Sequence, residues 1–404
     1  MLPEPEAFFY YYPANTFVTL SPERLPILPF LHQARQALLL DVRSPAEYRH
    51  AHIPGAISLP LFTDEERKEV GTTYKQVSRE QAIKIGLDYF GPKMRSMVET
   101  VEALVADRCS LAASDQRSTP NDQRPTASIY LYCWRGGMRS AAVAWLLNLY
   151  GFKVRVLQGG YKAFRNHVLS LFTIPYSFNI LGGYTGSGKT ELLNELQNRG
   201  EAVIDLETLA SHKGSAFGNI NMPPQPSQEM FENNLAGELY QKFELEQYDL
   251  EVLKTFKTPY ADGQPLFKKA VWLEDESQRI GHINLPQFFW QTMRNAPVYF
   301  LDLPFEERLQ HLAEEYGHLD KERMTGAIQR ISKRLGGLET KKAIELLQED
   351  HITECFRILL HYYDKQYTKA LHSRQNLPDL LYKIPCTSVD KSNAQLLLPK
   401  PMIA

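Results

Sequence analysis

The sequence predicts an α/β protein with two units, each built on a parallel sheet, followed by a mainly helical C-terminal part. Two observations predict this fold. Short apolar runs typical of strands alternate with helical segments, and two of these runs end in glycine-rich turns that open a helix. The length of 404 residues is also too great for one ordinary domain.

Composition and charge place the chain among ordinary globular proteins. Hydrophobic residues make up 43% and charged residues 23% of the sequence. The net charge of −2 gives no overall attraction to nucleic acid, so an RNA partner would need local basic patches. The longest apolar run, Ala141 to Leu147, is too short to cross a bilayer, and the first residues lack the pattern of a signal peptide. We therefore expect a cytoplasmic protein with no membrane partner.

The strands and helices of the first unit can be assigned from local pattern. We expect strands at 37–42, 128–133 and 153–157, a short helix beginning at Ser44, and a helix ended by Gly151. The segment Asp107 to Ser128 is rich in Ser, Asp, Gln and Pro and has no apolar period, which predicts a surface insertion at about 107–128. The first domain is expected to cover residues 1–170.

The second unit is expected to cover residues 171–404. It should begin with a strand at Phe178, followed by a glycine-rich turn, a helix stopped by Gly200, and another strand at 201–206. From Leu309 onward apolar residues recur at helical spacing.

The glycine-rich turn GYTGSGKT matches the P-loop pattern and has the expected strand before it and helix after it. Its backbone N–H groups can surround a diphosphate, the lysine adds a positive charge, and the threonine hydroxyl suits Mg²⁺. The predicted diphosphate-binding residues are Gly183, Tyr184, Thr185, Gly186, Ser187, Gly188, Lys189 and Thr190.

Acidic and basic residues further along the unit are candidates for a supporting role. Asp205 and Glu207 follow the expected strand at 201–206, and Glu274 and Arg279 follow another apolar run. Asp205 could equally cap the next helix. Arg308 stands where small P-loop kinases carry an arginine that faces phosphates, although a solvated helical charge is the commoner explanation.

Cys133 ends a strand and opens a loop whose far end begins a helix. Backbone amides and the helix dipole converge at such a position, where they lower the pKa of a thiol and form a cradle for an anion. The alternative is a buried, inert cysteine. The candidate anion-binding residues are Arg135, Gly136, Gly137, Arg139 and Ser140, with Cys133 as the catalytic nucleophile. The cysteines at 109, 355 and 386 have no comparable setting and show no zinc-like spacing.

These motifs together carry a family resemblance. DVRSPAEYRHAHIPGA, CWRGGMRS and GFKVRVLQGGYKAF resemble a rhodanese domain. Their fusion to GGYTGSGKT and VIDLETLASHKGSAFG resembles the tRNA 2-selenouridine synthase family, with TDEERKEVGTTYKQ and EDESQRIGHINLP in the same style.

The resemblance implies a transferase that acts on tRNA carrying 2-thiouridine at the wobble position. The P-loop domain would transfer a geranyl group from geranyl diphosphate to the sulfur. The rhodanese domain would then replace S-geranyl by selenium from selenophosphate, with Cys133 essential. No tightly bound cofactor is implied, and Mg²⁺ is possible. RNA phosphates could meet a basic patch of Arg330, Lys333, Arg334, Lys341 and Lys342, or these residues could form an ordinary solvated helix face.

Other functions stay open from the residues alone. Cys133 to Arg139 spans C-x5-R, which is also the signature of cysteine phosphatases, so a phosphatase fused to a nucleotide-binding module is one alternative. An ATP-dependent kinase or a tRNA sulfurtransferase with a rhodanese domain is another. A regulatory protein with two inactive anion sites is the third, and the intact Cys133, Lys189 and Thr190 argue against it. The isolated histidines His212 and His282 give no reason to expect a metal.

Overall fold

The computed structural model describes residues 22–113, 128–261 and 263–398. The chain divides into two compact units, Met1–His167 (unit 1) and Val168–Ala404 (unit 2). Each unit is built on its own parallel sheet, as the sequence predicts. The two units are described separately below.

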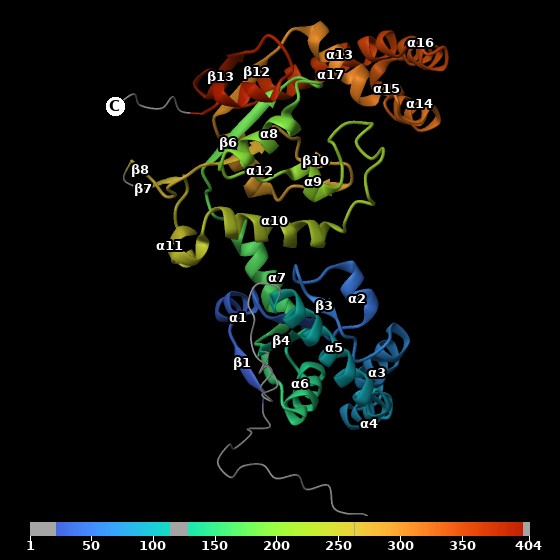
Figure 1. Ribbon diagram of the computed structural model, residues 1–404, viewed down its shortest axis with the longest axis vertical. Coiled ribbons are helices and arrows are strands. Elements are labelled where there is room, and N and C mark those ends of the chain that lie inside the picture. The colour runs from blue at the N-terminus through green and yellow to red at the C-terminus, as the bar shows by residue number, and fades with distance from the viewer. Residues whose placement is uncertain (1–21, 114–127, 262, 399–404) are drawn as a thin grey trace, which may run out of the picture. The chain divides into compact units, whose positions relative to one another are not determined.

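Unit 1 contains a five-stranded sheet in which all neighbours pair in parallel, in the order β1-β5-β4-β2-β3 (Figure 1). Its central strand carries the apolar run that leads to Cys133. The strands are β1 (Glu23–Leu25), β2 (Leu38–Asp41), β3 (Ile57–Ser58), β4 (Ser128–Tyr132) and β5 (Lys153–Leu157).

Side chains alternate between the two faces of this sheet. Leu40, Leu131 and Val156 point into a core shared with α5 and α6, whereas Tyr130 packs edge-on against Phe30 of α1 on the other face. The helices are α1 (Ile27–Ala34), α2 (Pro45–His50), α3 (Asp64–Gln76), α4 (Arg79–Phe90), α5 (Met94–Ala113), α6 (Met138–Tyr150) and α7 (Gly160–Leu171), with a 3₁₀ turn, η1, at Gly91–Lys93. The sheet and helix boundaries agree with the predicted strands and with the predicted end of α6 at Gly151.

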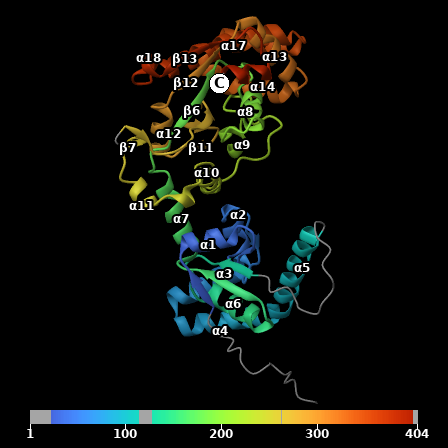
Figure 2. The same cartoon turned by 60° about the vertical axis from the view of Figure 1, so that its left-hand side comes forward.

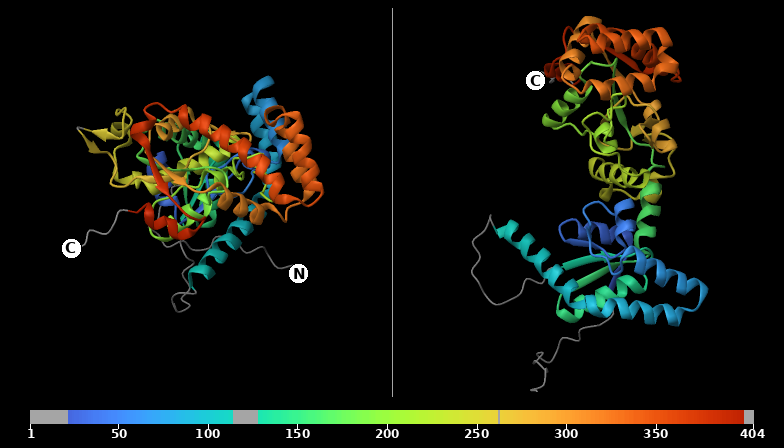
Figure 3. Two further views of the ribbon diagram at one scale, coloured as in Figure 1. Left: turned by 90° about the horizontal axis from the view of Figure 1, so that it is seen from above. Right: turned by 90° about the vertical axis from the view of Figure 1, so that its right-hand side faces the viewer.

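The polar segment expected to form an insertion from Asp107 begins as a helix instead. Helix α5 continues to Ala113, and its C-terminal turns project from the body of unit 1 (Figure 3). Buried Val101 and Val105 anchor the helix in the core, and the residues up to Ala113 simply extend it. Residues 114–127 and the side chain of Cys109 lie outside the described residues.

Unit 2 contains a four-stranded parallel sheet in the order β13-β12-β6-β9. Its strands are β6 (Phe178–Gly183), β9 (Val271–Glu274), β12 (Val298–Asp302) and β13 (Leu381–Pro385). The strand predicted at 201–206 is wrong. Only Val203 forms a single parallel bridge, to Trp272, because Asp205 two residues later already caps the next helix.

The C-terminal part of unit 2 is mainly helical, as predicted, and α13, α14 and α17 gather at one end of the unit (Figure 2). The helices are α8 (Lys189–Asn198), α9 (Leu206–Ala210), α10 (Gln228–Lys242), α11 (Leu250–Leu253), α12 (Gln287–Arg294), α13 (Phe305–Tyr316), α14 (Lys321–Arg330), α15 (Ser332–Leu335), α16 (Gly337–Gln348), α17 (Ile352–His372) and α18 (Leu377–Leu380). Short pieces are η2 (Leu245–Gln247), η3 (Lys391–Leu396) and the hairpins β7 (Tyr260–Ala261) with β8 (Gln264–Pro265) and β10 (Arg279–Ile280) with β11 (Ile283–Asn284). Among the described residues, no helix is long and apolar enough to cross a membrane.

A buried ion pair fixes the end of β2 in unit 1. Arg43 is 1% exposed and donates to both carboxylate oxygens of Asp41, which is 0% exposed. The same guanidinium donates to the carbonyl oxygen of Ala51, at 2.6 Å, and lies 3.8 Å from the ring centroid of Tyr161. Because Ala51 is the C-terminal cap of α2, this arginine ties α2 to the sheet.

Asp41→Ala should leave Arg43 buried without its carboxylate. Removing one partner of a buried ion pair costs about 3–5 kcal/mol, so hydrogen exchange of the β2 and β4 amides in the full chain should show a loss of stability of that size. The matched control is Glu99→Ala, which breaks an ion pair to Arg95, itself 90% exposed, and should cost much less stability. Equal effects of the two substitutions would contradict the structural role of the buried pair.

Candidate active sites

The first candidate site is the loop between β4 and α6. Cys133 follows the last residue of β4, and its sulfur lies 3.2 Å from the hydroxyl of Ser140 in the first turn of α6. Burial raises the pKa of the Cys133 thiol, which is 3% exposed. The Ser140 hydroxyl, the charge of Arg139 and the backbone N–H groups of Ser140 and Arg135 outweigh burial, so the pKa is lowered from its ordinary value. The thiol is therefore set up to ionise, although it packs beside an apolar core.

Two glycines allow the backbone to approach closely around this loop. Gly136 has a φ of +64°, and Gly160 at the start of α7 has a φ of +62°. A Cβ on Gly160 would lie 2.3 Å from the carbonyl oxygen of Cys133. That carbonyl also accepts the N–H of Tyr161, at 2.8 Å. The Gly159-Gly160 turn thus packs directly against the backbone of the cysteine loop.

The charged residues around the loop differ in their roles. Arg139 is half-buried and donates to Glu47 of α2 at 2.8 Å, whereas the side chain of Arg135 is exposed and only its backbone N–H serves the sulfur. Gly137 forms the N-terminal cap position of α6. Burial raises the pKa of Glu47, but the combined effect of Arg139, the backbone N–H of Ser44 and Arg67 is larger. The pKa is therefore lowered from its ordinary value, and the carboxyl stays ionised.

Arg67 is a functional candidate that the sequence analysis did not single out. It comes from α3, lies 3.7 Å from Glu47, and its Nε is buried without a hydrogen-bond partner in the part of the chain described. Its pKa is lowered, first by burial and then by Arg139, while Glu47 and Cys133 favour its charge. Glu47 therefore holds two arginines beside the thiol. Arg67 lies in TDEERKEVG, so the family-style motif was the available signal.

The second candidate site is the P-loop between β6 and α8, which has the predicted strand–turn–helix form. Gly183, Gly186 and Gly188 have φ values of +155°, +79° and +68°. A Cβ on Gly186 would lie 2.7 Å from the carbonyl oxygen of Arg308. Lys189 folds back over the loop and donates to the carbonyl of Gly183 at 2.9 Å. The loop therefore has the curvature that anion-binding nests require.

Two carboxylates meet the C-terminal end of this loop. Glu207 Oε2 lies 3.4 Å from the hydroxyl of Thr190, and the backbone N–H of Glu207 donates to Glu274 Oε1 at 2.7 Å. Glu274 is 3% exposed and its Oε2 has no hydrogen-bond partner among the described residues. Burial raises the pKa of Glu274, and the charges of Asp205 and Glu207 raise it further. Burial also raises the pKa of Glu207, against the opposing charge of Lys189.

Comparison with known proteins assigns both units to one family. The sequence profile of the rhodanese-like domain matches residues 30–89 and 103–167, and that of the tRNA 2-selenouridine synthase AAA domain matches residues 176–253 and 260–382. The tRNA 2-selenouridine synthase of Shewanella denitrificans is 34% identical over 83% of this chain and 89% of its own length. That of Hydrogenovibrio crunogenus is 35% identical over 83% and 90%. The chain belongs to the tRNA 2-selenouridine synthase family.

Two of the residues predicted to support the P-loop in this synthase-family chain instead stabilise local structure. Asp205 caps α9, with Oδ1 accepting the N–H of Thr208 at 2.7 Å, so the alternative reading of that residue is the one observed. Arg279 is exposed, and its Nε donates to the carbonyl of Gly281 within the β10–β11 hairpin. The described contacts of Arg279 thus place it in a hairpin rather than at the P-loop.

Arg308 of α13 stabilises the P-loop through a hydrogen bond to its backbone. It is 3% exposed, forms two hydrogen bonds to the carboxylate of Asp364 at 2.8 and 2.9 Å, and donates to the carbonyl of Thr185 at 3.1 Å. Its guanidinium lies 4.9 Å from the ring centroid of Tyr184. Arg308 is therefore neither a solvated charge nor an arginine that faces phosphates freely, because its hydrogen bonds go to Asp364 and to the backbone of the loop.

Tyr367 of α17 was also missed by the sequence analysis. Its hydroxyl accepts the N–H of Gly183 at 3.2 Å and donates to Asp275 at 2.7 Å, and Asp275 pairs in turn with Arg374. Helix α17 therefore fixes the first residue of the P-loop. A tyrosine within a long amphipathic helix gives no local signal of such a contact.

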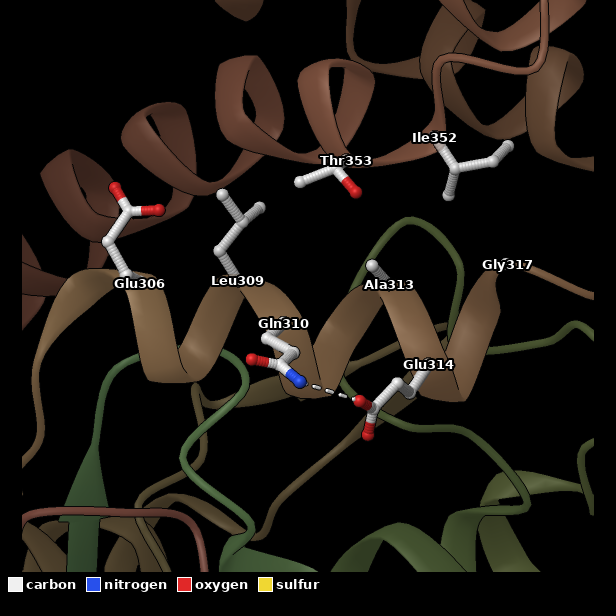
Figure 4. A pocket seen from close by; sticks show the side chains of 8 residues that line it. All are labelled: Glu306, Leu309, Gln310, Ala313, Glu314, Gly317, Ile352 and Thr353. Carbon is white, nitrogen blue, oxygen red and sulfur yellow. Dashed lines mark hydrogen bonds between the residues drawn. The ribbon is translucent and has the colours of Figure 1, made fainter.

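A hollow of about 630 Å³ between α13 and α17 does not resemble an anion site (Figure 4). Carboxylates of Glu306 and Glu314 lie on it, and Gln310 donates to Glu314 at 3.0 Å. None of the P-loop residues lines it. Glu306 pairs with Arg357, and the lining of this hollow does not provide a cradle for an anion.

Ser140→Ala should raise the pKa of Cys133, because it removes a hydrogen bond that stabilises the thiolate. The midpoint of the pH profile for alkylation of Cys133 by iodoacetamide, followed by peptide mass spectrometry, should move to higher pH. Cys355 provides an internal control, since burial raises its pKa to about 12 and it should stay unlabelled in both proteins. An unchanged midpoint after Ser140→Ala would show that the hydroxyl does not tune the thiol.

Proposed function

We propose that the chain replaces sulfur by selenium in 2-thiouridine at the wobble position of tRNA, in two steps at two sites. The observation that carries the proposal is the ionisable Cys133 in an anion cradle, on the same chain as a P-loop. Relatives that bear the synthase name match both units over most of their length. Neither a lone phosphatase nor a lone kinase needs both sites.

The first step is geranylation at the P-loop. The nests of residues 183–190 hold the diphosphate of geranyl diphosphate, and Lys189 turns from the Gly183 carbonyl to the leaving oxygens. The bond between C1 of geranyl and oxygen breaks with its electron pair on the diphosphate. A new bond forms between C1 and the sulfur of the base, and the N3 proton is released. Neutralising the diphosphate charge makes this ionisation easier.

Mg²⁺ fits the same site. The hydroxyl of Thr190 and the carboxylate of Glu207 lie 3.4 Å apart, and Glu274 accepts the N–H of Glu207, while its buried Oε2 has no hydrogen-bond partner among the described residues. Hard oxygen ligands of this kind, completed by phosphate oxygens and water, suit the ion. When bound, Mg²⁺ would supply additional charge neutralisation for the diphosphate.

The second step is selenium transfer in unit 1. Selenophosphate binds at the backbone cradle of Cys133, with Arg139 and Arg67 meeting its negative charge as Glu47 releases them. Selenium replaces the sulfur at C2 of the base, the geranyl group leaves as a thiol, and water takes the phosphoryl group as phosphate. Selenium keeps its oxidation state, so the step needs no reductant. The Cys133 thiolate is required for this exchange.

The tRNA backbone requires basic side chains that remain accessible. All five basic residues of the predicted patch are exposed, but Arg330 donates to the carbonyl of Ala216 and Lys341 lies 3.7 Å from Glu345. We therefore assign Lys333, Arg334 and Lys342 to RNA phosphates.

Cys133→Ala should stop selenium transfer while geranylated tRNA accumulates, because the thiolate is lost and the P-loop is intact. Thiolated tRNA is incubated with geranyl diphosphate and selenophosphate, digested to nucleosides and examined by mass spectrometry. The control Cys386→Ala removes a buried thiol of unit 2 whose pKa is raised by burial, and it should behave like the unaltered protein. If folded, unaltered protein gives neither geranylated nor selenated nucleoside, the proposed function is wrong.

Lys189→Ala should slow geranylation by about a hundredfold or more, the usual effect of removing one charge-stabilising donor. The same variant should still convert tRNA that was geranylated beforehand, since that step uses unit 1. Lys383→Ala, which removes an exposed lysine on β13, serves as the control and should leave both rates unchanged. Loss of both activities in Lys189→Ala would argue against the division of labour.

A further inference from the structure

Lys213 lies in the segment that connects α9 to α10 in unit 2. The segment belongs to the family-style motif that follows the P-loop, and the two proposed steps give it no role. It leaves α9 with the N–H of His212 donating to the carbonyl of Glu207 at 3.0 Å. Two residues after Lys213, Ser215 lines the same small cavity as Thr185 of the P-loop. The segment therefore lies beside the P-loop.

The backbone around Lys213 is held in place. Its N–H donates to the carbonyl of Gly218 at 2.9 Å, and its carbonyl accepts the N–H of Ser215 at 2.6 Å. Gly214 has a φ of +64° and packs against Glu276, because a Cβ there would lie 2.7 Å from Oε1 of that carboxyl. A change of partner at Lys213 therefore requires movement of the side chain and not of the segment.

The side chain of Lys213 has a weaker attachment than its backbone. The ammonium lies 2.5 Å from Glu315 of α13 and 5.4 Å from the ring centroid of Tyr316. The side chains of Lys213 and Glu315 are 38% and 31% exposed, and an ion pair with this much access to water contributes little to stability. The lysine can therefore exchange Glu315 for a more highly charged partner at little cost.

Glu207 connects Lys213 with the P-loop electrostatically. Its Oε2 lies 3.4 Å from the hydroxyl of Thr190, and its side chain also hydrogen-bonds to Glu276. Burial raises the pKa of Glu207, and the positive charges of Lys189 and Lys213 both oppose that effect. Two lysines therefore act on the carboxyl that contacts the P-loop threonine, and the P-loop itself supplies one of them.

A departing diphosphate needs more positive charge than Lys189 alone supplies, because it carries more than one negative charge. Arg308 is engaged by Asp364 and by the loop backbone, and Arg279 donates to a carbonyl of its own hairpin. Lys213 differs from both arginines, since its partner is a half-exposed carboxylate that it can leave.

We propose that Lys213 is a second cation of the P-loop site, and that its ammonium leaves Glu315 to bind oxygens of the diphosphate. The inference deepens the proposed function and rests on it, because it takes the P-loop as the site of an allylic diphosphate. Lys213 then opposes the charge that develops on the diphosphate as the bond from C1 to oxygen breaks. Glu315 competes with the diphosphate for the lysine, so removal of either partner should have a different effect on binding.

The test alters the two partners separately and measures binding of inorganic diphosphate with Mg²⁺ to the full chain by isothermal titration calorimetry. Lys213→Met should weaken binding about tenfold or more, because one charged hydrogen bond is lost. Lys213→Arg keeps the charge and should bind within about threefold of the unaltered protein. Glu315→Gln frees the lysine and should leave binding unchanged or strengthen it by up to about fivefold.

Lys254→Met is the matched control, because it removes a lysine that pairs with Glu251 at 2.7 Å in the same unit, and it should leave binding unchanged. If the pair of Lys213 and Glu315 only holds the segment in place, Lys213→Met and Glu315→Gln should weaken binding alike. That result would overturn the assignment, as would unchanged binding in a folded Lys213→Met protein.

Thermal melting confirms folding, and transfer of the geranyl group to thiolated tRNA is followed in the same proteins. If Lys213→Met does not fold, Glu315→Gln decides: weaker binding overturns the assignment, and equal or stronger binding supports it. If the unaltered protein binds diphosphate but transfers no geranyl group, the proposed function is wrong, while the binding results still decide the role of Lys213. Failure of the unaltered protein to bind diphosphate would overturn both.

Discussion

The close approach of backbone to backbone at glycine positions is the constraint on which both candidate sites depend. A single methyl group on Gly160 would collide with the carbonyl oxygen of Cys133, and one on Gly186 would collide with the carbonyl of Arg308. Side chains cannot be accommodated where two chain segments touch in this way. Glycine therefore lets a strand end in a tight turn whose N–H groups converge, and both candidate sites contain such a turn.

Charge in the two sites is balanced by residues from elements distant in sequence. In unit 1 Glu47 of α2 holds Arg139 of α6 and Arg67 of α3, and the buried Arg43 ties α2 to the sheet. In unit 2 Glu207 accepts the hydroxyl of Thr190, lies next to Glu274, and is close enough to Lys189 to be affected by its charge. Each candidate site thus combines a backbone cradle with acidic and basic side chains.

Local pattern predicted the parts of the molecule that depend on neighbouring residues. The strand before Cys133, the end of α6 at Gly151 and the strand–turn–helix of the P-loop follow from period and from glycine, and all three are observed. The strand at 201–206 failed because the pattern of EAVIDL cannot show that Asp205 will cap a helix.

Contacts across the fold were beyond local pattern for the same reason. Arg67, Tyr367 and the edge strand β13 reach their positions only through tertiary packing. Arg308 is buried against Asp364, and local pattern could not predict this pair because the two residues are 56 positions apart in the chain. The family resemblance identified the correct family, but it could not by itself distribute these roles among residues.

The surroundings of the described cysteines bear on the type of chemistry in unit 1. Cys355 and Cys386 are buried in unit 2 and their pKa values are raised, whereas Cys133 alone among the three has its pKa lowered. A mechanism that oxidises Cys133 and regenerates it through a neighbouring thiol would need a second ionisable cysteine. The proposed exchange of an alkylated sulfur for selenium needs none, because geranylation would convert a poor leaving group into a neutral thiol and no electrons are exchanged overall. One thiolate and one P-loop are therefore sufficient for the two-step scheme that we propose.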